Sequence, residues 1–369
     1  MLSSGSTSQL FSGEQLILCH DDSVGLRAAI AIDDTRLGPA VGGVRLRSYP
    51  DESAALTEVH RLARTMTLKN AVAELPYGGA KSVIIQDGRT PPSGPERIEL
   101  MRRFGEFVAR TAGTYIPGVD MGTTVEDLAI IGASGAPVSC SRLDPSPWTA
   151  VGVASAIRAA VTTVDNRSDL EGVRILIQGV GHVGAALAHD LAFNGASVIV
   201  TDIDDTRAAE LADKVGGTSV AAERALEVSC DVFAPCAVAR VVSRATLGRL
   251  SCRIIVGAAN DILADRSLAA SLASRGITYV PDFVSNAGGV VHIYAVANSW
   301  DSETLTTTLG RIGDRVTEIL EEAELVAATP LAVAERRAER ALAAATAVST
   351  NGHGPSASKP KGTPERLAA

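Results

Sequence analysis

The sequence predicts an α/β fold of two domains, in which the second domain contains a doubly wound parallel sheet and C-terminal helices close the structure. The first observation is length, because 369 residues exceed a typical single domain more than twofold. The second is a regular alternation of apolar strands and helices from Val173 onward. The third is a glycine-rich motif at residues 179–184, directly after the first of those strands.

The composition is that of an ordinary globular enzyme. Hydrophobic residues make up 46% of the chain and charged residues 21%. A formal net charge of -8 disfavours binding to nucleic-acid phosphates. The apolar stretches are interrupted by charges and are too short to span a bilayer. We therefore expect small-molecule chemistry, with neither a nucleic acid nor a membrane as partner.

The two ends and the cysteines favour a cytoplasmic protein. The first residues, MLSSGSTSQLFSGEQ, lack the basic and long apolar regions of a secretory signal. Five scattered cysteines without a CxxC pair argue against a disulfide framework or a zinc site, so no metal is expected. The final stretch, 349–369, is rich in Ser, Pro, Gly and Lys and is expected to be a disordered tail.

The first half mixes strands and helices without a nucleotide motif. Residues 25–32 predict a strand, and apolar residues at helical spacing predict a helix over about 53–73. The segment YGGAKSVII predicts a glycine turn that enters an apolar strand, and a further helix carries Ile98 to Val108. Two prolines in DPSPWTAVGV end one element before an Ala- and Val-rich helix begins near Trp148. We place the first domain at 1–147.

In the second half of the chain, predicted strands alternate regularly with predicted helices. Strands are predicted at VRILIQ, SVIVTD, DVFAP, RIIVGAA and ITYVPD, with helices between them. After Asn286 the chain becomes mostly helical, through about 303–326 and 330–347. The second domain is therefore placed at 148–325, and residues 326–348 are expected to form a C-terminal helix that returns to the first domain.

The glycine motif is the signature of dinucleotide binding. Residues 179–184, GVGHVG, follow a strand and open a helix, where glycines allow a tight turn and close approach to a pyrophosphate. Asp202 lies 18 residues past Gly184 at the end of the next strand, where it can bind ribose hydroxyls and repel a 2′-phosphate. This pattern predicts a Rossmann domain that binds NAD rather than NADP. His182 is expected to be a helix N-terminal residue. The alternative is a glycine turn that binds nothing, or another nucleotide.

Three residues of the first half are candidates for acid–base chemistry. Lys81 follows two glycines and enters an apolar strand, so burial would lower its pKa and let it act as a base. Lys69 ends the predicted helix at MTLKNA, and Asp120 stands in a glycine-rich loop. The alternatives are a lysine that extends to water and an aspartate that only closes a turn. The pair Gly42-Gly43 either presents N–H groups to a carboxylate or forms a hairpin turn.

Ten segments, taken together, resemble the glutamate/leucine/phenylalanine/valine dehydrogenase family across about residues 15–345, and the apolar-substrate branch most of all. They occur in the following order: GGVR, MTLKNA, LPYGGAKSV, YIPGVDMGTT, DPSPWTAVGV, QGVGHVG, VTDID, APCA, GAAN and PDFVSNAGG. The resemblance implies a homo-oligomeric enzyme that converts an apolar L-amino acid, with NAD and water, reversibly into its 2-oxo acid and ammonium.

The resemblance also implies roles for individual residues. Lys81 would be the catalytic amine that activates water, with a pKa lowered by Lys69, and Asp120 would carry a proton to and from the substrate amino group. Lys69 would hold the α-carboxylate. The substrate-binding residues that it implies are Val41, Gly42, Gly43, Met66, Lys69, Gly118, Asn286, Val290 and Ile293. The cofactor-binding residues that it implies are Thr149, Gly179, Val180, Gly181, His182, Val183, Gly184, Asp202, Ala237 and Asn260.

The substrate side chain is less well defined. Val41, Gly118, Val290 and Ile293 carry no charge, and burial of an unpaired γ-carboxylate among them would cost several kcal/mol, which disfavours glutamate. The space beside Gly118 favours phenylalanine, whereas the bulk at the other three positions favours leucine or valine. Three departures from the family pattern are Ala80, Asp261 and a shortened loop before Asp144. The alternatives are an unusual substrate such as tryptophan, or an NAD-binding protein without catalysis.

Overall fold

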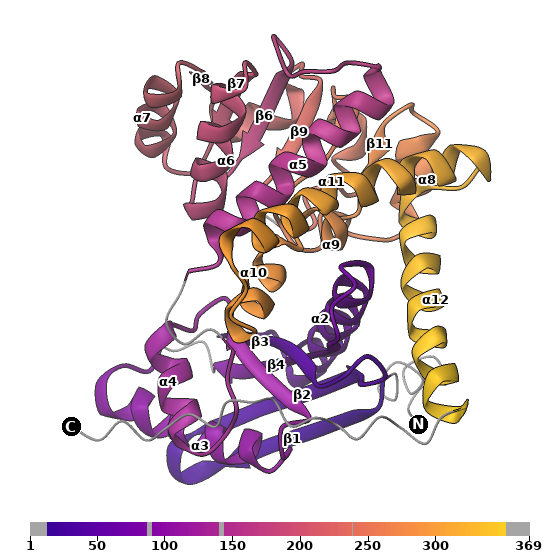
Figure 1. Ribbon diagram of the computed structural model, residues 1–369. Helices are drawn as coiled ribbons and strands as arrows, with labels where there is room; N and C mark the ends of the chain where they lie inside the picture. Colours follow the sequence, from indigo (N-terminus) through magenta and orange to yellow (C-terminus); the bar gives the residue numbers. More distant parts are fainter. Residues whose placement is uncertain (1–12, 87–90, 140–143, 238, 352–369) are drawn as a thin grey trace, which may run out of the picture.

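The computed structural model describes residues 13–86, 91–139, 144–237 and 239–351. Figure 1 shows two sheets, each with its own helices, joined by the helices that follow the second sheet. The predicted fold class is confirmed. No helix among the residues that the structure describes is long and apolar enough to cross a membrane.

The first sheet has five strands in the order β1-β2-β4-β3-β5. The strands are β1 (Gln15–Asp21), β2 (Leu26–Asp34), β3 (Ala40–Ser48), β4 (Gly78–Gln86) and β5 (Tyr115–Val119). β2 is antiparallel to β1 and β4, while β3 runs parallel to both β4 and β5. Because β3 lies between β4 and β5, side chains from three separate stretches of sequence meet above it.

The side chains of this sheet alternate between two cores. Ala29 and Ala31 of β2 pack with Ala55 and Val59 of α2 (Glu52–Val72). Ile30 and its neighbours on the opposite face pack beneath α3 (Gly94–Ala109) and α4 (Val125–Ala133). The alanines on the α2 face allow a close approach between helix and sheet, which brings the end of α2 to β4.

The second sheet is parallel throughout, in the order β11-β10-β9-β6-β7-β8. The strands are β6 (Arg174–Gln178), β7 (Ser197–Thr201), β8 (Thr218–Ser219), β9 (Val232–Pro235), β10 (Ile254–Ile255) and β11 (Thr278–Tyr279). The helices around it are α5 (Ser146–Asp165), α6 (His182–Phe193), α7 (Asp205–Val215), α8 (Leu268–Ala273) and α9 (Asp282–Ser285). The chain reverses its direction of travel across the sheet between β6 and β9, and such a switch point is where a doubly wound sheet binds its ligand.

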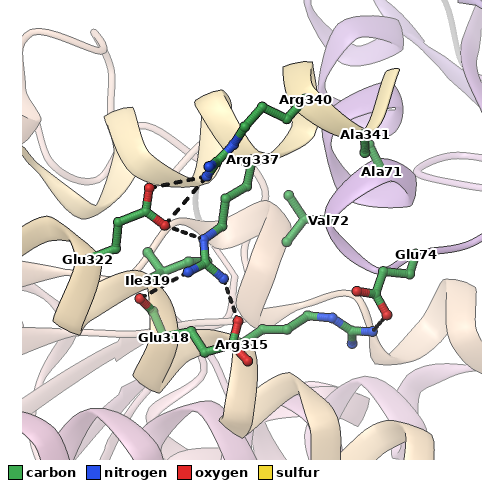
Figure 2. Close-up of a pocket in the computed structure, with 10 residues that line it drawn as sticks. All are labelled: Ala71, Val72, Glu74, Arg315, Glu318, Ile319, Glu322, Arg337, Arg340 and Ala341. Atoms are coloured by element: carbon green, nitrogen blue, oxygen red, sulfur yellow. Dashed lines mark hydrogen bonds and ion pairs between the residues drawn. The ribbon is translucent and has the colours of Figure 1, made fainter. Parts of the chain in front are cut away.

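Three further helices follow in the described part of the chain: α10 (Gly288–Ala297), α11 (Ser302–Leu325) and α12 (Pro330–Asn351). α12 leaves the second sheet and packs beside α2 of the first, as Figure 1 shows. A cavity of about 340 Å³ lies where these elements meet, and Figure 2 shows the residues that line it. Arg337 of α12 pairs there with Glu322 of α11, and Arg315 of α11 pairs with Glu74 after α2. This cavity holds none of the predicted catalytic residues.

Several sequence predictions need correction. Gly42 and Gly43 lie inside β3 and not in a hairpin turn, and Gly78 and Gly79 are the first residues of β4 and not a turn before it. Gly42 and Gly43 pair with β5, and Gly78 and Gly79 pair with β3, so all four have strand backbone. β1, β3, β5 and α4 were not predicted. Helix α12 extends to Asn351, three residues past the predicted 348, and the rest of the expected tail lies outside the described residues.

Candidate active site

Lys81 and Asp120 form an ion pair above the first sheet. Lys81 is the fourth residue of β4, and Asp120 directly follows β5. The Lys81 Nζ lies 3.0 Å from the Asp120 Oδ2, and the side chains are 8% and 16% exposed. The turn in which Asp120 lies is held by Thr123, whose hydroxyl accepts the Asp120 N–H and donates to the Val44 carbonyl. The carboxylate itself is therefore free to pair with Lys81, contrary to the alternative that it closes the turn.

Gly43 of β3 makes room for this pair. A Cβ atom at Gly43 would lie 2.7 Å from the Asp120 Cβ and 3.0 Å from the Lys81 Nζ. A Cβ at Gly42, which faces the other way, would lie 1.6 Å from the Ala80 carbonyl oxygen. The first glycine therefore permits the approach of β4, and the second permits the ion pair. Neither effect requires the substrate-carboxylate role that the resemblance implied.

Two residues that the sequence motifs did not identify complete the cluster: the buried Arg45 and the half-buried Glu58. The Arg45 Nε of β3 donates to the Asp120 Oδ2 at 2.8 Å, and the Arg45 Nη1 pairs with Glu58 of α2. Arg45 is 8% exposed. A charged residue inside the apolar strand AVGGVRL was the available sequence signal, because buried charges are rare unless paired. The partners lie on other elements and could not be predicted from that strand alone.

Burial and the charges of the cluster shift the pKa values of both catalytic candidates, Lys81 and Asp120. Burial lowers the pKa of Lys81, and Asp120 opposes that change. Burial alone would raise the pKa of Asp120, but Lys81 and Arg45 lower it well below its usual range. The cation that most lowers the pKa of Lys81 is Arg45 and not Lys69 as expected, because Arg45 contacts the same carboxylate. Asp120 is a carboxylate in this arrangement.

Lys69 links the two sheets. It lies in the last turn of α2, fully buried, and burial lowers its pKa to about 8. The Lys69 Nζ is 3.4 Å from the side-chain oxygen of Asn260, which also accepts a hydrogen bond of 3.0 Å from Asn286. The Asn286 side-chain oxygen is buried without a hydrogen-bond partner among the described residues. The buried Lys69 cation is a suitable counterion for a carboxylate ligand, whereas the unpaired Asn286 oxygen is an acceptor and suits a hydrogen-bond donor.

The glycine motif has the geometry that a pyrophosphate needs. Gly179 has a φ of +96°, and a Cβ at Gly184 would lie 1.9 Å from the Gly179 carbonyl oxygen. A Cβ at Gly181, by contrast, meets nothing within 4 Å, so there is open space beside the N-terminus of α6, where a pyrophosphate would bind. Gln178 and Thr201, which end β6 and β7, each carry a buried side-chain oxygen without a partner among the described residues. These features fit a dinucleotide.

The remaining residues of the motif occupy different environments. Val180 is buried, Val183 is half-buried, and the exposed His182 opens α6 with its Nδ1 3.2 Å from a carboxylate oxygen of Asp144. Ala237 is exposed, and its Cβ would clash with a Cβ at Gly179. His182 is therefore a helix N-terminal residue, as predicted.

Asp202 lies beside this motif. Its Oδ2 accepts the Val180 N–H at 2.8 Å, and its Oδ1 lies 2.6 Å from Arg207 of α7. Burial alone would raise the pKa of Asp202, but these contacts lower it, so the side chain is a carboxylate. The next residue, Ile203, is 92% exposed.

The residues predicted to surround the substrate side chain come from four elements. Val41 is buried in β3, Gly118 is buried in β5, and Met66 is half-buried in α2, while Val290 and Ile293 are half-buried in α10. A Cβ at Gly118 would lie 2.8 Å from the Ser139 hydroxyl, so the space expected there is already occupied. Thr149 of α5 faces Gly289 of α10. A Cβ at Gly289 would lie 2.8 Å from the Thr149 hydroxyl.

One cavity of about 810 Å³ receives residues from both sheets. Asp120, Arg45 and Glu58 line it from the first sheet and α2, and Ala237 and Asn260 line it from the second. A dinucleotide fold that shares a cavity with Asp120 of this acid–base pair is the arrangement expected of an NAD(P)-dependent oxidoreductase.

Comparisons with known proteins agree. A family model for the Glu/Leu/Phe/Val dehydrogenase dimerisation domain matches residues 14–134, and one for Glutamate/Leucine/Phenylalanine/Valine dehydrogenase matches residues 200–349. Leucine dehydrogenase of Thermoactinomyces intermedius is 37% identical, over 89% of this chain and 90% of its own. Phenylalanine dehydrogenase of Bacillus thermotolerans is 35% identical, over 90% and 88%. The crystal structure of L-tryptophan dehydrogenase from Nostoc punctiforme has a TM-score of 0.77 at 34% identity, covering 94% and 100%.

The chain belongs to the glutamate/leucine/phenylalanine/valine dehydrogenase family. It is an amino-acid dehydrogenase, an oxidoreductase that acts on a CH–NH2 group with NAD or NADP. The predicted family and enzyme class are thereby confirmed, whereas the roles given to individual residues stay predictions.

Proposed function

We propose that this enzyme catalyses the NAD-dependent, reversible oxidative deamination of an apolar L-amino acid to its 2-oxo acid and ammonium. The observation that carries the proposal is the buried contact of 3.0 Å between Lys81 and Asp120, within reach of the dinucleotide fold. Gly43 leaves room for both Lys81 and Asp120, because a side chain at this position would contact both. An ion pair with only a structural role would not explain this glycine.

The roles follow from the chemistry of the reaction. NAD bound at residues 179–184, beside Thr149, Ala237 and Asn260, would accept a hydride from the substrate Cα. Lys69, which lies beside Asn260 and Asn286, holds the α-carboxylate as its counterion. Lys81, with its lowered pKa, takes a proton from the water that attacks the iminium carbon. Asp120 exchanges a proton with the departing amino group. Enclosure between the two sheets keeps bulk water away from these groups.

Asp202 supports NAD as the coenzyme. Its carboxylate can accept hydrogen bonds from both ribose hydroxyls, and it would repel the 2′-phosphate of NADP. The exposed apolar side chain of Ile203 is suited to contact a flat base next to that ribose.

An apolar substrate is supported by the residues around the predicted pocket. Val41, Gly118, Val290 and Ile293 provide no cation for a γ-carboxylate, and an unpaired buried carboxylate would cost several kcal/mol. The relatives named above act on leucine, phenylalanine and tryptophan, which are all apolar. The Ser139 hydroxyl beside Gly118 reduces the space for a large ring, so leucine or valine is preferred to phenylalanine.

We also propose a homo-oligomer that works in the cytoplasm. The description of the family model for residues 14–134 as a dimerisation domain supports the assembly. The four cysteines among the described residues are free thiols, which agrees with a reducing compartment.

The test is NADH formation with a panel of L-amino acids at alkaline pH, with the best substrate repeated with NADP. We expect selective turnover of leucine, valine or phenylalanine with NAD. Lys81→Ala should abolish turnover and still bind NADH, as measured by fluorescence titration. Turnover of tryptophan alone would favour the unusual-substrate alternative, and NAD binding without turnover of any amino acid would favour a binding protein.

A further inference from the structure

Arg45 and Asp120 are held together by the order of the strands. β3 lies between β4, which carries Lys81, and β5, which Asp120 follows, so three sequence-distant residues project from neighbouring strands. The Arg45 Nε and the Lys81 Nζ lie 2.8 and 3.0 Å from the same oxygen, Asp120 Oδ2. A second guanidinium nitrogen of Arg45, Nη2, is 3.5 Å from the other carboxylate oxygen. Asp120 is thus held by two cations.

The same guanidinium is held from its far side. Glu58 of α2 pairs with the Arg45 Nη1, and a second oxygen of Glu58 lies 3.8 Å from Arg47. The side chains of Arg45, Glu58 and Asp120 are 10%, 16% and 16% exposed. Four charges therefore alternate in sign from Glu58 through Arg45 and Asp120 to Lys81, where burial leaves them weakly screened.

We propose that Arg45, itself fixed by Glu58, is the positioning residue of the reaction: it holds Asp120 as a carboxylate directed at Lys81 while Lys81 gives up and regains its proton. The inference rests on the proposed function, in which Lys81 and Asp120 perform the chemistry.

The reason lies in the different chemistry of the two cations. Lys81 must lose its proton to act as a base, and at that moment it stops neutralising Asp120. A guanidinium does not deprotonate in proteins, so Arg45 remains as the counterion. Without Arg45, the neutral form of Lys81 would leave a buried carboxylate unpaired, which is strongly unfavourable. Arg45 therefore makes the neutral amine accessible at a lower pH.

Arg45 and Glu58 carry opposite charges, so they are expected to shift the pKa of Lys81 in opposite directions. Arg45 lowers the pKa of Lys81, and Glu58 raises it. Other ionisable groups from several elements also lie around Lys81 and Arg45, and all of them remain in the variants below. They are Asp120 after β5, Arg61 and Lys69 on α2, Asp282 on α9, Tyr115 on β5 and Tyr49 after β3.

The experiment is the pH profile of kcat/KM for deamination by the full-length enzyme, with Arg45→Gln, Arg45→Lys and Glu58→Gln. In Arg45→Gln we expect the acid limb, which reports the deprotonation of Lys81, to move to higher pH by about one unit, a tenfold change in proton affinity. In Glu58→Gln the limb should move to lower pH. In Arg45→Lys, which keeps the charge, the limb should stay close to that of the parent.

An acid limb that stays in place in both glutamine variants, or that moves in the same direction in both, would overturn the role of Arg45. A purely structural role would lower kcat without displacing the limb. Thermal unfolding of each variant identifies any that does not fold. If Arg45→Gln does not fold, the shift to lower pH in Glu58→Gln and the unmoved limb in Arg45→Lys still decide the question. Lys81→Ala separates the failure of the proposed function from the failure of the role of Arg45. Turnover in Lys81→Ala would refute the proposed function. If Lys81→Ala is inactive and the acid limb does not move in the glutamine variants, only the role of Arg45 is refuted.

Discussion

Arg61 of α2 forms an ion pair with Asp261, which lies in the loop after β10 of the second sheet. The pair connects the two sheets at the cavity that holds Asp120 and Asn260. Asp261 has a φ of +54°, and its carbonyl accepts the N–H of Arg240.

We expect Asp261→Asn to lower the stability of the connection between the sheets. Asparagine tolerates the same left-handed backbone, so the change removes the charge and leaves Arg61 half-buried without its partner. The free energy of unfolding should fall by about 1–3 kcal/mol. Urea unfolding measures it, with Arg61→Gln and the double variant completing a cycle. Additive effects of the two single variants would show that the pair contributes nothing.

The sequence was sufficient for the parts of the site that depend on local order. The glycine motif, its strand and helix, and Asp202 lie within 30 residues, and their pattern predicts their geometry. The position of Arg45 beside Asp120 could not be predicted in this way, because 75 residues separate them and their contact depends on the pairing of β3 with β5.

Two further features depend on tertiary packing. Gly42 and Gly43 were expected to act through their backbone N–H groups, but the structure shows that their missing side chains serve the approach of β4 and of Lys81. The space predicted beside Gly118 is taken by Ser139, which lies in the segment before the shortened loop. Only the three-dimensional structure reveals which atom fills such a space.

Gly43→Ala should abolish activity with a smaller loss of stability than Gly42→Ala. The new methyl group at residue 43 meets the Asp120 Cβ and the end of the flexible Lys81 side chain, which can move aside at the cost of their contact. At residue 42 it meets the rigid backbone of Ala80, so the sheet itself must distort. Thermal unfolding and kcat are measured on both. Equal losses of stability, or an active Gly43→Ala enzyme, would contradict this assignment.

The pKa of Lys69 predicts the alkaline limb of the pH profile. Burial lowers that pKa to about 8, so in the free enzyme the protonated amine is present below about pH 8 and is lost as the pH rises. If Lys69 holds the substrate carboxylate, kcat/KM for the amino acid should fall above that pH, because kcat/KM reports groups of the free enzyme. Lys69→Gln should have a lower kcat/KM throughout and no such decline. An alkaline limb that persists in Lys69→Gln would assign it to another group.

Asp202 and Arg207 should together decide the coenzyme. In Asp202→Asn the side-chain oxygen can still accept the Val180 N–H, but the charge that repels a 2′-phosphate is gone. Arg207, which lies 2.6 Å from Asp202 in the parent enzyme, is then free to meet that phosphate. The ratio of kcat/KM for NAD to that for NADP should fall at least about tenfold, equivalent to about 1.4 kcal/mol. The double variant Asp202→Asn/Arg207→Ala should lose most of the gain with NADP, because the phosphate then has no cation. A ratio that does not change in Asp202→Asn would show that coenzyme choice is made elsewhere on the second sheet.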